Sequence, residues 1–257
     1  IFFKLDDVPV SEKEVELLRI VDSNDLKRIT LTNYCVFKRL PYSVLSYWIP
    51  NEIYRAFERF FPLSSYSDIA VGIQTGDDER FCRLWYEINS RDISKDYFTA
   101  VFGGEPQKFY RDFPLLINWA KGGAEILNLC DEHGKLRSRP QNRDYYFREG
   151  LTFIYTGAYF SVQPLHRQSI ITVAGQGIFP FKKCDKLIIL GMLNSYLSLC
   201  FAKIINPGRF FQAGYVSSIP MPVLSNTKDK DLIEKSVNSA IGVRIRSLQF
   251  DETSRLY

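Results

Sequence analysis

The sequence has 257 residues, of which 46% are hydrophobic and 24% are charged, and its formal net charge is +4. A high apolar content with so small a net charge excludes an intrinsically disordered chain, and the length suits one large domain or one domain with an appendage. Every apolar stretch is interrupted before the roughly 18 residues that a membrane-spanning helix needs, so we expect no membrane segment.

Two helices are predicted before the first strand. Residues 11–20 have Ser11 at the N-cap position and Glu14 three residues later, a pattern typical of a capping box. Residues 51–61 place apolar side chains on one helical face, and Pro62 ends that helix because proline disfavours helical backbone at the residue before it.

The middle of the chain predicts short strands separated by glycine-containing turns. The expected strands cover residues 68–73, 81–88, 108–113, 151–155, 158–162 and 169–175. The Gly157-Ala158 turn favours a hairpin, and the triplet Gly175-Gln176-Gly177 is interpreted as a turn. Strands in the middle with helices at both ends predict an α+β fold, with central mixed or antiparallel strands and flanking helices.

Residues 185–205 form the longest predicted helix, which Asn206-Pro207-Gly208 ends. Apolar residues recur along it at helical spacing and are expected to be buried, namely Leu190, Leu193, Leu197 and Phe201. A last helix is predicted over residues 229–249.

These elements divide the chain into three expected parts, which are a helical lead-in (1–64), a central domain (65–225) and a C-terminal helix (226–257). The linker-like stretch 223–231 marks the second boundary. Charge is uneven along the chain, because residues 151–223 carry six basic side chains and one acidic side chain. Such a surplus makes a polyanion a candidate partner, although ordinary solvated surface is the plainer interpretation.

Motifs of familiar catalytic sites are absent from the sequence. It has no GxSxG, HExxH, Walker or GxGxxG motif, and its two histidines have no zinc-ligand spacing. The densest acidic cluster is Asp77-Asp78-Glu79, which could bind Mg²⁺ but is more typical of a helix cap or a solvated turn. We therefore expect no active site, cofactor or metal in this chain. A metal-dependent nuclease site at these acids is the alternative.

The cysteines and the first residue indicate where the chain resides and where it comes from. Five cysteines form no close pair, which favours a reducing, cytoplasmic compartment over a disulfide framework. The chain begins with Ile1 and shows no signal-peptide pattern, so we expect it to be a piece of a longer polypeptide.

Two polar stretches on expected loops carry residue types that contact DNA. Residues 72–76 follow a strand and contain an amide and a hydroxyl, and residues 135–148 combine arginines with amides. Lys and Arg neutralise phosphates, whereas Arg reads guanine, and Gln or Asn reads adenine, in the major groove. A polar loop held by ion pairs to Asp144 and Glu149 is the alternative interpretation.

Three stretches, taken together and in this order, resemble one protein family. They are GIQTGDDERFCRLWYEI at 72–88, GKLRSRPQNRDYYFREGLTF at 134–153 and LGMLNSYLSLCFAKIINPGRFFQAGYVSSIPMP at 190–222. They resemble the C-terminal target-recognition region of large adenine-specific DNA methyltransferases of bacterial defence, of the BREX (Pgl) and type IIG classes. The third stretch is also similar to type I restriction specificity subunits, through Leu193-Asn194-Ser195 and Ile219-Pro220-Met221-Pro222. The resemblance covers roughly residues 35–225.

The resemblance implies a division of labour within a longer enzyme. In such enzymes an upstream domain binds S-adenosylmethionine and acts on a flipped adenine through an Asn/Asp-Pro-Pro-Tyr/Phe loop, while the recognition domain grips double-stranded DNA. This chain has no Pro-Pro dipeptide, so the catalytic loop and the cofactor are expected upstream. Type IIG members also carry a nuclease domain, and BREX members generally do not. The expected partners are duplex DNA, the upstream methyltransferase domain and other defence-system subunits.

Residue types and resemblance together nominate side chains for contact with DNA. The nominated residues are Gln74, Thr75, Arg80, Lys135, Arg137, Arg139, Gln141, Asn142, Arg143, Arg209 and Gln212. Core packing is expected of Phe210 and Phe211. The alternative function is a protein-interaction module that docks other subunits of the defence complex.

Overall fold

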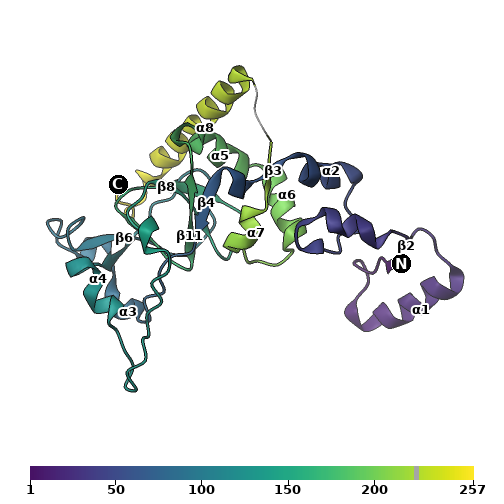
Figure 1. The fold of residues 1–257 in the computed structure, drawn as a ribbon, viewed down its shortest axis with the longest axis horizontal. Coiled ribbons are helices and arrows are strands. Elements are labelled where there is room, and N and C mark those ends of the chain that lie inside the picture. The colour runs from purple at the N-terminus through teal and green to yellow at the C-terminus, as the bar shows by residue number, and fades with distance from the viewer. Residues whose placement is uncertain (223–225) are drawn as a thin grey trace. The chain divides into compact units, whose positions relative to one another are not determined.

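The computed structural model describes residues 1–222 and 226–257 (Figure 1). The chain divides into two compact units, residues 1–59 and 60–257. The linker expected at 223–231 and the boundary expected after residue 225 fall partly on residues that lie outside the described ones, and the three-part division stays a prediction.

The first unit is built from short helices and one small pair of strands. Its elements are β1 (Phe2–Phe3), α1 (Lys13–Ser23), β2 (Ile29–Thr30) and α2 (Asn51–Arg59), with 3-10 turns at Val10–Glu12, Tyr34–Arg39 and Pro41–Ser43. Ile20, Phe37 and Tyr54 are buried. The Tyr54 hydroxyl donates to the Ser46 carbonyl oxygen at 2.8 Å, so its polar end is satisfied.

The capping box predicted for the first helix is wrong. Ser11 lies in the preceding 3-10 turn, and α1 follows Glu12 with no side-chain hydrogen bond at its N-cap. The helix consequently begins two residues later than predicted and ends at Asn24, whose left-handed backbone closes it.

The second unit contains two four-stranded sheets with helices around them. One sheet has the order β10-β6-β7-β5 and the other has the order β4-β11-β8-β9. The strands are β3 (Phe61–Pro62), β4 (Ser67–Ala70), β5 (Cys82–Leu84), β6 (Tyr97–Val101), β7 (Leu115–Asn118), β8 (Gly150–Ile154), β9 (Val162–Leu165), β10 (Ser169–Ile171), β11 (Gly175–Pro180) and β12 (Pro220–Met221). All of these pairs are antiparallel except β10 with β6, so the predicted α+β fold with mixed and antiparallel strands is confirmed.

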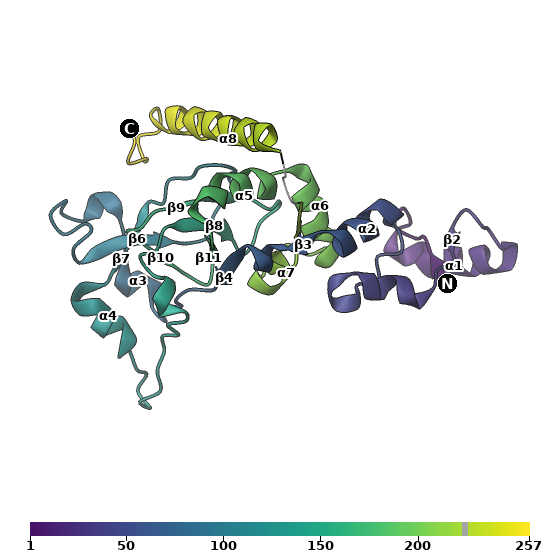
Figure 2. The same ribbon diagram turned by 45° about the horizontal axis from the view of Figure 1, so that its top comes forward.

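The helices of the second unit lie mainly after its last long strand. They are α3 (Asp78–Phe81), α4 (Ala120–Leu127), α5 (Lys186–Leu193), α6 (Tyr196–Ile205), α7 (Ala213–Ser217) and α8 (Thr227–Leu248). Helix α8 lies along α5 (Figure 2). Gly191 of α5 permits this approach, because a Cβ there would lie 2.8 Å from Val237 of α8.

The triplet Gly175-Gln176-Gly177 is not a turn but the start of β11. Gly175 pairs with Ile154 of β8, and a Cβ on it would lie 2.2 Å from the Val101 carbonyl oxygen. The glycine therefore serves a close approach of two backbones rather than a reversal of the chain.

Several predicted strands differ from those observed. Residues 108–113 and most of 158–162 form no strand, and the strand expected at 81–88 stops at Leu84 before a 3-10 turn. Strands β8 and β9 do pair as an antiparallel hairpin, so the predicted hairpin is confirmed with a longer loop. The wrongly predicted strands arise because aromatic residues favour strands locally, whereas burial against the sheets decides which segments actually pair.

The single helix predicted over 185–205 is two helices, α5 and α6, which bend by 77° between them. Ser195 caps α6 by accepting from the Ser198 amide at 3.2 Å. The buried Asn194 side chain accepts from the Val162 amide at 3.0 Å and donates to the Val162 carbonyl oxygen at 2.9 Å. The Leu-Asn-Ser motif thus ends one helix, starts the next and ties the break to strand β9.

The bend also changes which apolar side chains are buried. Leu190, Leu193 and Phe201 are buried as predicted, but Leu197 is 50% exposed. Among the described residues no single helix is long and apolar enough to cross a membrane, and the bent α5–α6 pair meets that test only when its two parts are taken together.

We predict that Asn194→Ala lowers the free energy of unfolding by about 2 kcal/mol, because it leaves the buried Val162 amide without a partner and removes one of the two hydrogen bonds to the Val162 carbonyl oxygen, which still accepts from the Phe109 amide. Urea unfolding measures the loss, and hydrogen exchange should show the Val162 amide exchanging faster. The matched control is Asn128→Ala, where an exposed amide is removed and the expected loss is about 0.5 kcal/mol or less. Equal losses in both variants would contradict the assignment.

Candidate nucleic-acid interface

Residues 72–76 and 135–141, predicted as separate loops, lie side by side and are joined by one antiparallel bridge, between Gln74 and Arg139; we call this pair of segments the ladder. The Gln74 amide donates to the Arg139 carbonyl oxygen at 3.1 Å, and the Arg139 amide donates to the Gln74 carbonyl oxygen at 2.8 Å. Residues directly opposite in an antiparallel pair have their side chains on the same face. The structure therefore brings Gln74 and Arg139 together, although 64 residues lie between them in the sequence.

The ladder has one exposed face and one buried face. Gln74, Arg137 and Arg139 are exposed, whereas Thr75 and Ser138 between them are each 2% exposed. This alternation is the period of two that a strand imposes on its side chains. The outward face consequently presents two guanidinium groups and one amide.

Gly76 lies opposite Arg137 in this register and makes room for it. Its φ of 81° is left-handed, and a Cβ would lie 2.7 Å from the Arg137 carbonyl oxygen. Nη2 of Arg137 donates to the Gly76 carbonyl oxygen at 2.9 Å, and Nη1 lies 3.9 Å from a carboxylate oxygen of Asp77. The guanidinium is thus steadied beside the turn while 46% of the side chain stays exposed.

Thr75, Asp77 and Arg80 build the turn that carries the ladder. The Thr75 hydroxyl donates to the Asp78 carboxylate and accepts from the Asp77 amide at 3.2 Å. Asp77 caps α3 by accepting from the Arg80 amide at 3.1 Å, and the Arg80 guanidinium pairs with Glu125 of α4. The acidic cluster therefore acts as a helix cap, and the described residues contain no group of three potential metal ligands.

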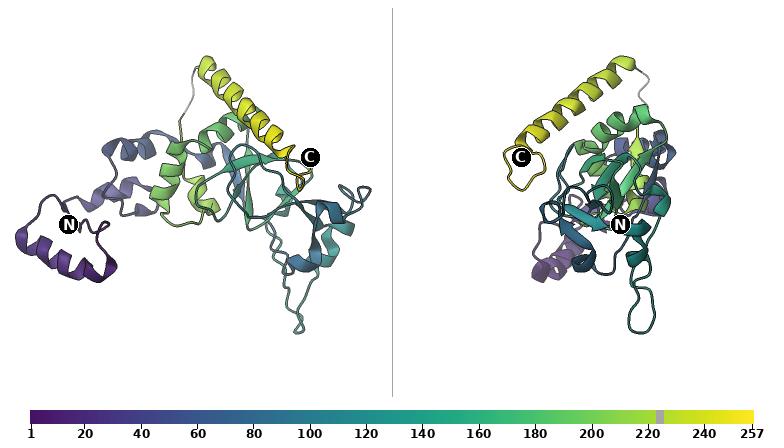
Figure 3. Two further views of the ribbon diagram at one scale, coloured as in Figure 1. Left: turned by 180° about the vertical axis from the view of Figure 1, so that it is seen from behind. Right: turned by 90° about the vertical axis from the view of Figure 1, so that its left-hand side faces the viewer.

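The second strand of the ladder continues from a hairpin, residues 129–137, which projects past α3 and α4 (Figure 3). The Arg137 amide donates to the Leu129 carbonyl oxygen at 2.8 Å, and the Asp131 amide donates to the Lys135 carbonyl oxygen at 2.9 Å. The Asp131 carboxylate also accepts from the Lys135 amide at 2.8 Å and closes the turn. Lys135 is exposed there.

Asn142 and Gln141 anchor the far end of the ladder. The side-chain amide of Asn142 donates to the Val71 carbonyl oxygen at 2.9 Å. Asn142 itself has a left-handed backbone, with a φ of 50°. Gln141 is half-buried, and its carbonyl oxygen accepts from the Tyr146 hydroxyl at 2.9 Å. Burial raises the pKa of the Tyr146 phenol well above its ordinary value, so that hydroxyl remains a donor.

Arg143 is exposed beside a hollow lined by Trp119, Asp144, Tyr146 and Phe147. The alternative interpretation, in which loop arginines pair with Asp144 and Glu149, does not describe the observed ion pairs. Across residues 1–222 and 226–257, Glu149 pairs with Lys186 and Arg167 instead.

Arg209 and Gln212 are exposed at a third segment, just before α7. The Arg209 carbonyl oxygen accepts from the Gly157 amide at 3.0 Å, which attaches this segment beyond the end of β8. Their neighbour Phe211 is buried as predicted, whereas Phe210 is 48% exposed and lies against Tyr155.

The third segment and the ladder lie at the same end of the β4-β11-β8-β9 sheet. Ile154, where β8 ends, pairs with Gly175, where β11 begins. Ala70, where β4 ends and the chain enters the ladder, pairs with Gly177. All three nominated segments therefore converge on one sheet end, although only two of them pair directly.

The sequence does contain a signal for the exposed face of the ladder. Basic or amide side chains occupy every second position from 135 to 143, namely Lys135, Arg137, Arg139, Gln141 and Arg143. This alternation is typical of a strand with one polar face. The prediction of a loop over this segment overlooked the alternation.

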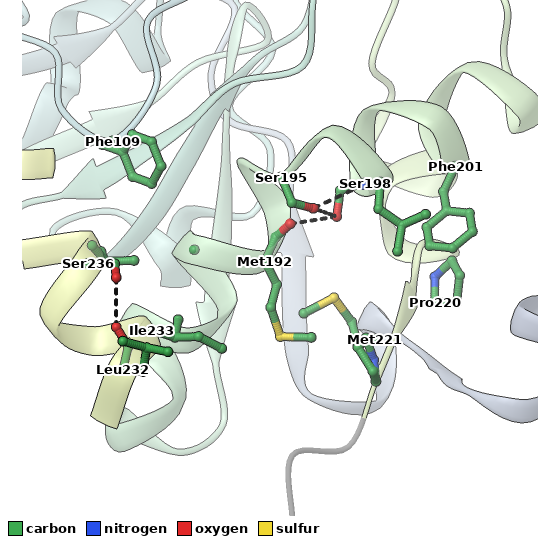
Figure 4. A pocket seen from close by; sticks show the side chains of 14 residues that line it. Phe109, Met192, Ser195, Ser198, Phe201, Pro220, Met221, Leu232, Ile233 and Ser236 are labelled. Carbon is green, nitrogen blue, oxygen red and sulfur yellow. Dashed lines mark hydrogen bonds between the residues drawn. The ribbon is translucent and has the colours of Figure 1, made fainter. Parts of the chain in front are cut away.

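A separate apolar pocket of about 520 Å³ lies among α5, α6, β12 and α8 (Figure 4). Met192 and Met221 point toward each other across it. The hydroxyls of Ser198 and Ser236 donate to the carbonyl oxygens of Met192 and Leu232, at 2.7 and 2.8 Å. The Ser198 hydroxyl of α6 is therefore engaged by α5 and the Ser236 hydroxyl by its own helix α8, and the lining that remains is mostly apolar.

No family model matches the sequence. The chain is 24% identical over 243 residues to the adenine-specific methyltransferase PglX of Lacticaseibacillus casei (strain Zhang), covering 89% of this chain and 20% of that protein. It is 28% identical over 247 residues to the adenine-specific methyltransferase BrxX of Escherichia coli O9:H4 (strain HS), covering 92% and 19%. The chain has homologues among the Pgl and BREX adenine-specific methyltransferases. It spans about a fifth of the length of these relatives.

Among solved structures, the type IIL restriction–modification enzyme MmeI in complex with DNA is similar with a TM-score of 0.47 and 16% identity. The match covers 75% of this chain and 29% of that one. A likeness at this level does not establish a common fold.

We predict that Gly76→Ala separates the ladder, because the new Cβ would clash with the Arg137 backbone as well as strain a left-handed residue. The amides of Gln74 and Arg139 should then exchange with solvent faster, and stability should fall by about 1–3 kcal/mol. The matched control is Gly122→Ala, which has a φ of 71° and no atom within 4 Å of its Cβ, and so reports backbone strain alone. Unchanged exchange at both amides in Gly76→Ala would contradict the pairing.

Proposed function

We propose that this chain is the DNA-recognition part of an adenine-specific DNA methyltransferase of bacterial restriction–modification or phage defence, without a catalytic site of its own. The observation that carries the proposal is the exposed face of the ladder, where Gln74, Arg137 and Arg139 from two distant segments lie side by side. A two-stranded β-ribbon fits the major groove, and arginine and amide side chains are the groups that read bases there.

The contacts of each side chain suggest its part in recognition. Arg139 has no ion pair to any carboxylate of the described residues, so its five donors are free to fork onto guanine, and Gln74 beside it suits adenine. Arg137 uses one donor on Gly76 and suits a phosphate or a single base contact. Lys135 at the hairpin turn suits a phosphate, which positions the duplex without specifying its sequence.

The methyl-transfer chemistry is proposed to lie elsewhere in the same polypeptide. The relatives are named adenine-specific methyltransferases, and this chain corresponds to about a fifth of their length. An upstream domain would bind S-adenosylmethionine and accept the flipped adenine, while the ladder fixes which adenine is presented. We also propose a cytoplasmic location, which suits the five free cysteines.

A second function, docking of other defence-system subunits, is favoured by the apolar pocket and its surroundings. Leu197 and Leu232 line the pocket and are 50% and 65% exposed, and the neighbouring Tyr196 is 78% exposed. Apolar surface of this kind marks binding sites for proteins. Docking through it would be insensitive to salt, whereas DNA binding through the ladder would weaken steeply as salt rises.

We predict that Arg139→Ala or Gln74→Ala in the full-length protein relaxes or abolishes the methylated sequence motif, because each removes one base-reading pair worth about 1–3 kcal/mol. Sequencing of methylated adenines in cells that carry each variant measures the change. Arg246→Ala, which removes an exposed arginine from α8, is the matched control and should leave the motif unchanged. If both ladder variants fold and methylate the same motif as the wild type, the proposed interface is wrong.

A further inference from the structure

A second basic site lies at the opposite end of the β4-β11-β8-β9 sheet from the ladder. It is a pocket of about 380 Å³ whose charged lining residues are Arg148, Glu149, Arg167, Lys183 and Lys186. They come from three segments that meet there, because β8 begins, and β9 and β11 end, at this edge. None of them is among the side chains nominated individually for DNA contact, although Arg148 belongs to the basic stretch 135–148, and Arg167, Lys183 and Lys186 belong to the basic stretch 151–223.

Four cations surround a single carboxylate in this pocket. The Glu149 carboxylate pairs with the Lys186 ammonium, and its Oε2 lies 3.7 Å from Nε of Arg167. The hydrogen bond from Lys186, and the nearby charges of Lys186, Lys183 and Arg167, hold the pKa of the Glu149 carboxyl below its ordinary value. The carboxyl is therefore ionised near neutral pH, and the pocket still keeps a surplus of three positive charges.

Two of these cations have no acidic partner. Among residues 1–222 and 226–257, no carboxylate lies within 4.0 Å of Arg148 or Lys183. The Arg148 guanidinium lies over the rings of Tyr145 and Phe179, at 4.7 and 5.4 Å from their centroids. Stacking on two aromatic rings orders this cation without neutralising its charge.

The pocket also holds half of the basic side chains in the stretch 151–223 whose charge is uneven. Of the six basic side chains in residues 151–223, Arg167, Lys183 and Lys186 line it, and Lys182 adjoins them in the chain. Three of the six are therefore brought together in one pocket, whereas Arg209 lies at the other end of the sheet.

We infer that this pocket binds a phosphate group of the DNA backbone, as a second contact to the duplex that the ladder reads. The inference rests on the proposed function. The lining offers ammonium and guanidinium donors and no amide side chain, which suits phosphate rather than base edges.

The two ends of the sheet are separated by the length of its strands, which a duplex easily exceeds. The five residues of β8 span about 17 Å, and a duplex carries roughly ten phosphates along that length of its axis. Phe147 lines both this pocket and the hollow beside Arg143, so positive side chains continue from one site toward the other. DNA read at the ladder can therefore present backbone phosphates to the pocket.

The test is equilibrium binding of the 257-residue chain to short duplexes over a range of salt concentrations. Lys183→Ala and Arg167→Ala should each weaken binding roughly five- to tenfold at about 0.1 M salt, and should make the slope of log affinity against log salt shallower by about 0.9. The loss should be the same for every duplex sequence. Glu149→Gln should strengthen binding, because it removes the one carboxylate that repels phosphate.

Controls separate this inference from the proposed function. Lys235→Ala removes an exposed lysine from α8 and should bind like the wild type, and circular dichroism should show every variant folded. If Lys183→Ala and Arg167→Ala bind like the wild type while Arg139→Ala loses affinity, the pocket inference is wrong and the ladder stands. If the wild-type chain binds no duplex, the proposed function itself is wrong. A loss that depends on duplex sequence would also overturn the phosphate assignment.

Discussion

The backbone pairing of residues 72–76 with residues 135–141 is the constraint on which the candidate interface depends. Two reciprocal hydrogen bonds between Gln74 and Arg139 fix the register of the ladder. That register decides which side chains point inward, and the burial of Thr75 and Ser138 supports it. A shift by one residue would bury the arginines and expose the small polar residues, so the identity of the outward face follows from this one pairing.

The β4-β11-β8-β9 sheet acts as a rigid support between two basic sites of different character. At one end arginine and amide side chains stand on a ribbon, where the geometry suits bases. At the other end lysines and arginines surround Glu149 in a pocket, where the geometry suits phosphates. Sites on the ends of regular strands are held more precisely than sites on free loops. The distance between the two basic sites is therefore set by the length of the strands.

Acidic residues decide which of the many cations remain available. Arg80 is paired with Glu125, and Arg137 is partly engaged by Gly76 and Asp77. These pairs are well exposed, so they contribute little to stability and mainly orient the side chains. Arg139, Arg148 and Lys183 are left without carboxylate partners among the described residues. The residue type, Arg or Lys, did not by itself show which of these cations are paired with a carboxylate and which are not.

The sequence by itself determined the α+β class, the β8–β9 hairpin, most helix positions and the two polar segments, because these depend on local period, turn residues and helix stops. It did not determine that the helix over 185–205 breaks, since Asn194 ends it only by bonding to Val162 of a distant strand. Nor did it show that Gly175 belongs to a strand. A glycine is needed at this position because the Val101 backbone, which is distant in the sequence, approaches it too closely for a side chain. Only the tertiary structure decided that Gln74 meets Arg139 and that Arg148, Arg167 and Lys183 share a pocket. Pairing between segments far apart in the chain depends on long-range burial and register, which no local pattern encodes.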